Sequence, residues 1–277
     1  MDFLNQYRPK RLGDVLGQPA VVRALKQFVA EPYSVAMLFH GDTGVGKTST
    51  AFALAADLGC RVEEGDLGGV IELASGEQNG QHVRDTLRRL SLRPFFGSGW
   101  KVAIVNEVDR MTDAAETVWL DGLESLPDRS VVVMTTNSPE RLSRRMRERC
   151  DQYAFEGRRE KLQPVIQKMA RRIWSEQVGG KVKPPKFDKL GVPNDGLYDC
   201  LNVSFRLAIQ QLSRLVREAR RGNGTTNLDA VAAQIDRDSL GVSSYVAQCD
   251  HCGHTQEVYA FAKKVKCVAC GKTFTME

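Results

Sequence analysis

The chain has 277 residues, of which 42% are hydrophobic and 26% are charged, a composition typical of a globular protein with a buried core. Its formal net charge of +5 permits a nucleic-acid partner without requiring one. No apolar run approaches the ~20 residues that cross a bilayer, and the first ten residues lack the apolar segment of a secretory signal. We therefore expect a cytoplasmic protein with no membrane partner.

Strand-like and helix-like patterns alternate along the first 156 residues. Residues 19–29 predict an amphipathic helix, because Val21, Leu25 and Phe28 fall on one face. Short apolar runs typical of buried strands lie at 34–40, 70–73, 102–105 and 131–134, with a candidate fifth strand at 153–155. Helices are expected between them at about 47–58, 82–90 and 113–126. This alternation predicts a three-layer α/β domain with a parallel sheet over residues 1–156.

The strand pattern stops after residue 156. Helices at about 160–177 and 203–220 predict a small helical domain over residues 157–221. A glycine-rich and polar stretch then begins a linker at 222–246, with a short helix near 227–236. The remaining residues, 247–277, form a separate cysteine-containing module.

The first predicted strand ends at a glycine-rich segment that matches the phosphate-loop pattern G-x-x-x-x-G-K-[ST]. It consists of Gly41, Asp42, Thr43, Gly44, Val45, Gly46, Lys47 and Thr48. Glycines let successive N–H groups point at phosphate oxygens, and the following helix adds its positive N-terminal end. Lys47 supplies charge to the β- and γ-phosphates, while the Thr48 hydroxyl coordinates Mg²⁺. We therefore expect ATP and Mg²⁺ at this segment.

The strand at 102–105 is followed by Asn106 and Glu107, where an acidic pair is expected. Glu107 is placed to polarise the attacking water as a general base. Asn106 can orient a metal-bound water, but it brings no negative charge to Mg²⁺, a cation that favours carboxylates. We expect ATP binding to be retained, and both efficient and weak hydrolysis stay open.

Four of the seven cysteines form two C-x-x-C pairs near the end of the chain, namely Cys249, Cys252, Cys267 and Cys270. Each pair can present two thiolates to one ion, so the two pairs predict a tetrahedral structural Zn²⁺ site in a zinc ribbon. His251 and His254 are alternative ligands, although the spacing favours the four cysteines. A module this small is expected to fold only with its metal.

The surroundings of these cysteines suggest two roles for the ribbon. Basic and aromatic residues that could contact DNA are Tyr259, Phe261, Lys263, Lys264, Lys266 and Lys272. The alternative is a module that docks on or caps a protein assembly.

An ordered series of short segments shows a family likeness. In chain order they are 7–9 with 15–18, the phosphate loop, 72–76, 106–112, 133–137, 147–150 and 205–209. In these segments the chain resembles the AAA+ ATPases of sliding-clamp loaders, meaning the small subunits of replication factor C and the bacterial gamma/tau subunit. The likeness covers about residues 1–220 and implies a P-loop domain followed by a helical lid.

The resemblance implies roles for particular residues. The adenine pocket would include Tyr7, Arg8, Pro9, Val15 and Gln18, and Thr50 would be a further residue of the ATP site. Thr48 and Asn106 would hold Mg²⁺, and the catalytic set would be Lys47, Glu107, Asn137, Arg149 and Arg206. In that set Asn137 orients the attacking water, Arg206 lies near the γ-phosphate of its own site, and Arg149 reaches into the ATP site of a neighbouring subunit.

Three departures from the family pattern accompany the likeness. Asn106 replaces an aspartate, Glu148 replaces a serine, and the residues after 220 leave no room for a full helical collar. The resemblance implies an ATPase in an oligomer of AAA+ protomers, identical or different. Its expected partners are primer–template DNA and a sliding clamp, in DNA replication or repair. Two alternatives remain: a catalytically weak structural subunit, and a zinc-ribbon DNA-binding or adaptor protein regulated by ATP.

Overall fold

The computed structural model describes residues 2–75, 78–179, 182–187, 189–192 and 202–221. Beyond these it describes Cys252 and four short strands between residues 244 and 275. The predicted short helix at 227–236 lies outside the described residues.

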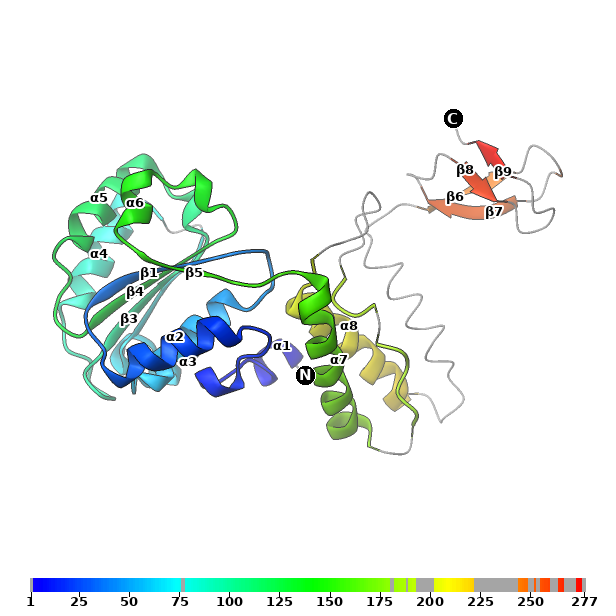
Figure 1. Ribbon diagram of the computed structural model, residues 1–277, viewed down its shortest axis with the longest axis horizontal. Coiled ribbons are helices and arrows are strands. Elements are labelled where there is room, and N and C mark those ends of the chain that lie inside the picture. The colour runs from blue at the N-terminus through cyan, green and yellow to red at the C-terminus, as the bar shows by residue number, and fades with distance from the viewer. Residues whose placement is uncertain are drawn as a thin grey trace.

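A five-stranded parallel sheet forms the centre of the first part of the chain (Figure 1). Its strands are β1 (Val35–His40), β2 (Val70–Leu73), β3 (Lys101–Val105), β4 (Ser130–Thr136) and β5 (Asp151–Ala154). Their order across the sheet is β2-β3-β4-β1-β5, so β1 lies between β4 and β5. The predicted parallel sheet is confirmed. β1, which precedes the phosphate loop, and β3, which precedes Asn106 and Glu107, end at the same edge of the sheet.

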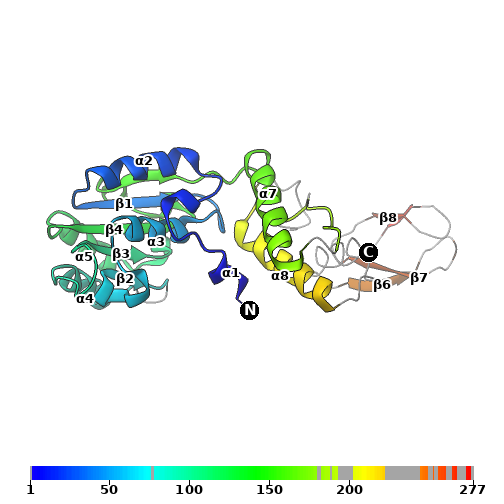
Figure 2. The ribbon, with the colours of Figure 1, turned by 90° about the horizontal axis from the view of Figure 1, so that it is seen from below.

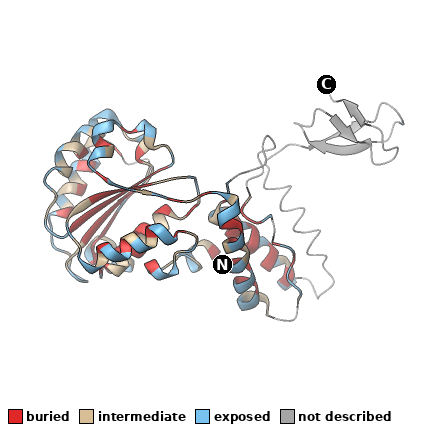
Figure 3. Ribbon diagram, viewed as in Figure 1, coloured by how far each residue is buried: buried red, intermediate tan, exposed pale blue. Residues whose placement is uncertain are grey.

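Helices cover both faces of this sheet. The α-helices of the first part are α1 (Phe3–Gln6), α2 (Pro19–Ala30), α3 (Lys47–Asp57), α4 (Gly80–Leu90), α5 (Asp113–Leu123) and α6 (Arg144–Glu148). Met37 and Phe39 of β1 pack in one core cluster with residues of α2 and α3. Leu38 packs in a second cluster with Trp119 of α5 and with residues of α4 and α6. The three-layer α/β architecture is therefore confirmed, and Figure 3 shows the buried strands between the helices.

The central strands are buried on both sides because their sequences are apolar on both sides. Residues 36–39 of β1 are at most 3% exposed, and all of β3 and β4 is buried. Glu72 is the exception in β2, since it is exposed while Val70, Ile71 and Leu73 are buried.

Two long helices follow the sheet. They are α7 (Arg159–Val178) and α8 (Phe205–Arg221), which pack against each other (Figure 2). Their interface includes Ile166, Ala208 and Leu212, and the amide of Gln211 accepts a hydrogen bond of 2.8 Å from the Gly191 N–H. Both ribbon views place α1 between the sheet and the α7–α8 pair. The N-terminal segment therefore joins the two parts of the molecule.

Short elements differ most from the sequence-based expectation. The helix α6 and the 3-10 turns η1 (Leu12–Asp14), η2 (Val62–Gly68), η3 (Val108–Arg110) and η4 (Pro139–Arg141) were not among the expected elements. They are too short for apolar periodicity to reveal them. Instead α6 starts at a local cap, where the Ser143 hydroxyl accepts a hydrogen bond of 3.2 Å from the Met146 N–H. The fifth strand ends at Ala154, one residue earlier than expected.

The C-terminal strands form two antiparallel pairs. In the first, β6 (Ser244–Gln248) pairs with β7 (Thr255–Tyr259), and in the second, β8 (Lys264–Lys266) pairs with β9 (Thr273–Thr275). Within the part of the chain that the structure describes, none of the helices is both long and apolar enough to span a lipid bilayer.

Candidate functional site

The phosphate loop connects β1 to α3 at the carboxyl edge of the sheet. Gly46 begins α3 with φ +104°, in the left-handed region, and a Cβ there would meet only open space. Backbone N–H groups at the N-terminus of a helix favour an anionic ligand.

Lys47 is nearly buried at the first turn of α3, with 8% of its surface exposed. Its Nζ donates hydrogen bonds of 2.7 Å to Gly41 O, to Asp42 O and to Asn137 Oδ1. All three acceptors are uncharged, so they orient the ammonium group without neutralising it. Burial lowers the pKa of Lys47 to about 8, and Arg206 is a second, smaller cause of lowering. The nearby Asp42 carboxylate offsets part of this lowering, and an anionic ligand would stabilise the charged form of Lys47 further.

Asn106 links the phosphate loop to the neighbouring strands. Its Oδ1 accepts a hydrogen bond of 2.8 Å from the Thr48 hydroxyl and a longer one of 3.3 Å from the Thr135 hydroxyl. Its Nδ2 donates to Glu72 Oε1 over 2.9 Å. A hydroxyl, an amide oxygen and a carboxylate are thus gathered at the end of β2 and β3. These hard oxygen donors fit Mg²⁺.

Glu107 adopts a backbone conformation that is uncommon for a residue other than glycine. Its φ is +54° and its ψ is 52°, in the left-handed region. The Glu107 N–H donates to Thr135 Oγ1 over 3.3 Å, and the carboxylate pairs with Arg110 at 3.4 Å. This turn directs the chain out of β3 and leaves the carboxylate in the wall of the pocket. Strained residues of this kind are concentrated at functional sites.

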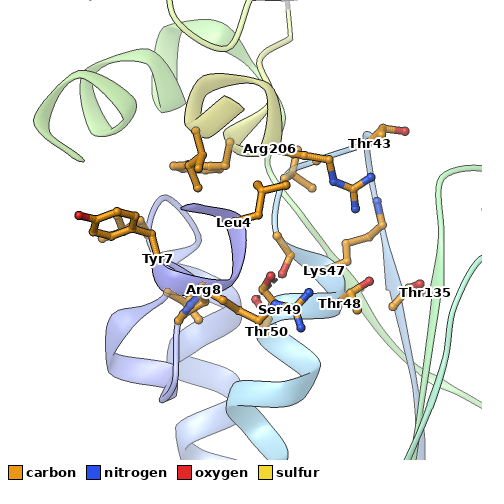
Figure 4. A pocket seen from close by; sticks show the side chains of 18 of the residues that line it. Leu4, Tyr7, Arg8, Thr43, Lys47, Thr48, Ser49, Thr50, Thr135 and Arg206 are labelled. Carbon is orange, nitrogen blue, oxygen red and sulfur yellow. Dashed lines mark hydrogen bonds between the residues drawn. The ribbon is translucent and has the colours of Figure 1, made fainter. Parts of the chain in front are cut away.

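A pocket of about 610 Å³ extends from these polar groups to the N-terminal segment. Its walls come from residues 43–50, from the ends of β3 and β4, and from the start of α8. Tyr7, Arg8, Pro9 and Val15 line the other end, together with Met169 and Ile209. Figure 4 shows Lys47 and Arg206 at one end and Tyr7 at the opposite end. The pocket therefore has a cationic end and a partly apolar end, as a nucleotide requires.

The N-terminal residues of the pocket are tied to neighbouring helices. The Tyr7 hydroxyl accepts a hydrogen bond of 2.7 Å from Gln177 Nε2 on α7 and approaches Glu176 at 3.3 Å. The Arg8 guanidinium lies over the Phe52 ring, 5.2 Å from its centroid. The pocket wall formed by α1 is thereby attached to α3 and to α7.

Four residues that the sequence analysis assigned to the ATP site have structural roles. Gln18 is 3% exposed and does not line the pocket; its amide exchanges hydrogen bonds of 2.9 and 2.8 Å with the backbone of Glu156. Thr50 is fully buried and donates to Gly46 O over 2.9 Å, although it borders the pocket. Gly41 and Asp42 contribute the backbone carbonyls that receive Lys47.

The two predicted catalytic arginines lie in different places. Arg206, at the start of α8, lines the pocket. Arg149 follows α6 and does not line the pocket; its guanidinium donates to Leu120 O on α5 and forms an ion pair with Glu124, the residue just after α5. The structure therefore brings Lys47, Glu107, Asn137 and Arg206 together and holds Arg149 elsewhere on the same protomer.

Most of the predicted zinc site lies outside the residues that the structure describes. Cys249, Cys267 and Cys270 are not among them, and Cys252 is exposed. Among the residues that are described, no group of three or more His, Cys, Asp or Glu side chains is arranged to hold a metal ion. The other described cysteines, Cys60 and Cys150, are buried, and burial raises the pKa of each thiol to about 12. The zinc ribbon stays a prediction.

Two polar residues at the site were not identified as site residues from the sequence. Glu72 lines the pocket and bonds to Asn106. Gln78 is 4% exposed, and its Nε2 donates to the Asn106 carbonyl. The signal for Glu72 was a single charged residue in an apolar strand. Gln78 precedes the Asn79 cap of α4 and carries no comparable signal.

Comparison with known proteins agrees with this geometry. Residues 37–158 match the family described as "ATPase family associated with various cellular activities (AAA)". Replication factor C subunit 3 of Saccharomyces cerevisiae is 30% identical over 209 residues, covering 73% of this chain and 58% of that protein. DNA polymerase III subunit tau of Bacillus subtilis is 26% identical over 190 residues, covering 62% and 33%. The chain spans about half the length of the curated relatives it matches.

A solved structure shares the fold. The RuvB Holliday junction branch migration motor of Thermotoga maritima superposes with a TM-score of 0.57 at 18% identity, covering 87% of this chain and 76% of that one. At this identity the likeness concerns the fold alone. Taken with the phosphate loop and the matched segments, these findings show that the chain contains an AAA-family ATPase domain and is related to replication factor C small subunits and to the tau subunit of DNA polymerase III.

Proposed function

We propose that this chain binds ATP with Mg²⁺ and hydrolyses it as one protomer of a clamp-loader-like assembly that acts on DNA. The observation that carries the proposal is the Lys47 contact set: a buried ammonium group at the pocket, hydrogen-bonded to Asn137 and to two loop carbonyls. Its position at the N-terminus of α3 matches the needs of a polyphosphate.

Each end of the pocket suits one part of the nucleotide. The loop N–H groups and Lys47 bind the phosphates, and Arg206 adds charge at the γ-phosphate. Thr48 and Asn106 hold Mg²⁺, which, when bound, neutralises charge that develops on the phosphate oxygens. The base and ribose occupy the end lined by Tyr7, Arg8, Pro9 and Val15.

Hydrolysis requires a base and an oriented water. Glu107 is the general base, and its left-handed backbone places the carboxylate at the pocket wall. Asn137 is held by Lys47 at 2.7 Å and orients the attacking water. The Glu107 carboxylate also forms an ion pair of 3.4 Å with Arg110.

Arg149 completes the site of a neighbouring protomer. In this protomer it lies outside the pocket and binds α5, so it contributes nothing to its own phosphates. An arginine supplied across an interface stabilises charge in the transition state and links hydrolysis to assembly. This arrangement supports an oligomer as the active form.

An exposed apolar patch supports a protein partner such as a sliding clamp. It consists of Leu67, Leu92, Phe95 and Phe96, which are 52%, 59%, 81% and 44% exposed. The Phe96 N–H donates to Leu67 O over 3.0 Å, so the patch is joined across two segments. A cluster of exposed apolar side chains is typical of a protein–protein contact. Replacing Leu92 and Phe95 by serine should weaken clamp binding and leave ATP binding unchanged, whereas Tyr33→Ser should affect neither.

A specific observation favours a second function, that of a structural subunit in which ATP holds the assembly together. The resemblance to clamp-loader ATPases implies an aspartate at this position, so Asn106 brings one negative charge fewer to the proposed Mg²⁺ site. A near-silent wild type, together with a large gain of hydrolysis in Asn106→Asp, would support that role.

The cysteine module has a proposed role of its own. A zinc ribbon held by Cys249, Cys252, Cys267 and Cys270 would add a DNA or protein contact to the ATPase. Deleting residues 247–277 tests this: an unchanged DNA affinity would argue against DNA binding by the ribbon.

The deciding measurement is steady-state ATP hydrolysis by the zinc-loaded chain, with and without primer–template DNA. Stimulation by DNA supports the proposed ATPase. Tight ATP binding without turnover under both conditions favours the structural subunit and argues against the proposed hydrolysis.

A further inference from the structure

Glu72 is the one charged residue of β2, a strand whose other residues are buried, and it lies at the nucleotide site. Its side chain lines the same pocket as Thr48 and Asn106. The strand pairing places Glu72 opposite Ile104, two residues before Asn106. The Asn106 N–H also donates to Leu73 O over 3.0 Å, which fixes the backbone of Asn106 against β2. The two side chains are therefore held together by the sheet.

The contact with Glu72 determines which way the Asn106 amide faces. A carboxylate can only accept hydrogen bonds, so the NH₂ group of Asn106 must face Glu72, at 2.9 Å. The amide oxygen is then turned toward the hydroxyls of Thr48, at 2.8 Å, and Thr135, at 3.3 Å. Without Glu72, either orientation of the amide could form hydrogen bonds with the two hydroxyls, which both donate and accept.

The negative charge that a Mg²⁺ site requires also indicates a role for Glu72. Asn106 contributes an oxygen dipole but no charge, whereas Mg²⁺ sites commonly include a carboxylate. Glu72 places a carboxylate directly behind the amide, within hydrogen-bond distance. We infer that Glu72 is the positioning residue of the Mg²⁺ site: it turns the Asn106 oxygen toward Thr48 and supplies the negative charge that Asn106 lacks. This inference rests on the proposed binding of ATP with Mg²⁺.

The test compares Glu72→Gln with the wild type. Glutamine keeps the length of the side chain and can still accept a hydrogen bond, so this change removes mainly the charge. We would measure binding of a fluorescent ATP analogue as a function of Mg²⁺ concentration, and Mn²⁺ binding by electron paramagnetic resonance. The Mg²⁺ concentration at half-maximal binding should rise about tenfold, a loss typical of one nearby charge. Binding of the analogue without metal should not change.

Two further variants separate the inference from a general effect on structure. Glu31→Gln, at an exposed position outside the pocket, should leave the Mg²⁺ dependence unchanged. Asn106→Asp in the Glu72→Gln background should restore the wild-type Mg²⁺ dependence, because it returns one carboxylate to the site. Asn106→Asp alone should not improve on the wild type, since it brings two carboxylates into contact.

The outcomes distinguish this inference from the proposed function. An unchanged Mg²⁺ dependence in Glu72→Gln, or no rescue by Asn106→Asp, overturns the role of Glu72 while ATP binding stands. If the wild type binds no nucleotide with or without Mg²⁺, the proposed function fails and the inference fails with it.

Discussion

The backbone N–H of Phe205 donates a hydrogen bond of 2.9 Å to the carbonyl oxygen of Gly44, so the phosphate loop is bonded directly to the first residue of α8. Gly44 has φ +79°, and a Cβ there would lie 2.0 Å from Ser204 Oγ. The loop and the helix that carries Arg206 thus approach each other too closely for any side chain at Gly44. A change of loop conformation on binding a ligand would be transmitted to α8.

Gly44→Ala should disrupt this contact. The added methyl group clashes with Ser204 and the left-handed φ strains an alanine, so α8 and Arg206 must move from the loop. We expect ATP affinity to fall at least tenfold, with the sheet domain still folded by circular dichroism. Gly65→Ala is the comparison, because Gly65 also has a positive φ, of +54°, a Cβ there meets no clash, and the residue lies outside the pocket. An equal loss in both variants would contradict a specific contact with α8.

ATP affinity should depend on pH through Lys47. The pKa of this group is about 8 in the free protein because of burial, and bound phosphate raises it by favouring the charged form. Below pH 8 the ammonium form predominates and affinity is constant. Above pH 8 binding must take up a proton, so affinity falls by up to tenfold per pH unit. Calorimetric titrations between pH 6.5 and 9.5 measure this profile.

Lys47→Arg is the control for that profile, since a guanidinium stays charged over the whole range. Its ATP affinity is expected to be weaker overall and to lack the inflection near pH 8. The same inflection in both proteins would assign the titration to another group.

Gln18 should contribute to stability and not to nucleotide contact. Its buried amide satisfies both backbone groups of Glu156, and Gln18→Ala leaves them unpaired inside the protein. Such a loss costs about 1–3 kcal/mol of unfolding free energy. Urea denaturation measures this cost, and Gln81→Ala on the exposed face of α4 should change stability by less than about 0.5 kcal/mol. An equal loss of stability in Gln18→Ala and Gln81→Ala would argue against a stabilising role for the hydrogen bonds between Gln18 and Glu156.

Arg149 should act in a neighbouring protomer. Lys47→Ala removes ATP binding but keeps the arginine, and Arg149→Ala keeps the ATP site but removes the arginine. Each variant alone should lose at least about 100-fold in hydrolysis, given the size of arginine-finger effects. Mixing the two should restore activity well above either one, at sites that combine both intact halves.

Arg145→Ala is the matched control for this experiment, because Arg145 is an exposed arginine of α6, the helix that Arg149 follows. It should hydrolyse ATP like the wild type. A mixture no more active than its components would place the action of Arg149 within its own protomer.

The strands and long helices could be predicted from the sequence because each depends on a local pattern. The apolar run before Gly41 predicts a buried strand, and the glycine spacing around Lys47 predicts the loop, with no need for distant contacts. Gln18 was placed in the nucleotide pocket by family likeness, but its actual partner is Glu156, which is distant in sequence. No local pattern encodes that pairing.

The Glu72–Asn106 contact illustrates the same limit. It depends on the parallel register of β2 and β3 and on the turn at Glu107, whose left-handed φ the sequence does not indicate. Strand order is equally non-local, since β1 pairs with β4 and β5 and not with β2. Arg149 was correctly separated from its own pocket only because the family likeness implied action across an interface.

The position of β1 also has a consequence for how the molecule is made. This strand carries the phosphate loop and is encoded early, yet its partners are residues 131–136 and 151–154. During synthesis, residues 35–40 stay unpaired until the chain has reached residue 136, and their second partner is complete only at residue 154. Pairings this far apart in sequence form slowly. An apolar central strand that waits for its partners is therefore a segment exposed to aggregation while the chain is being made.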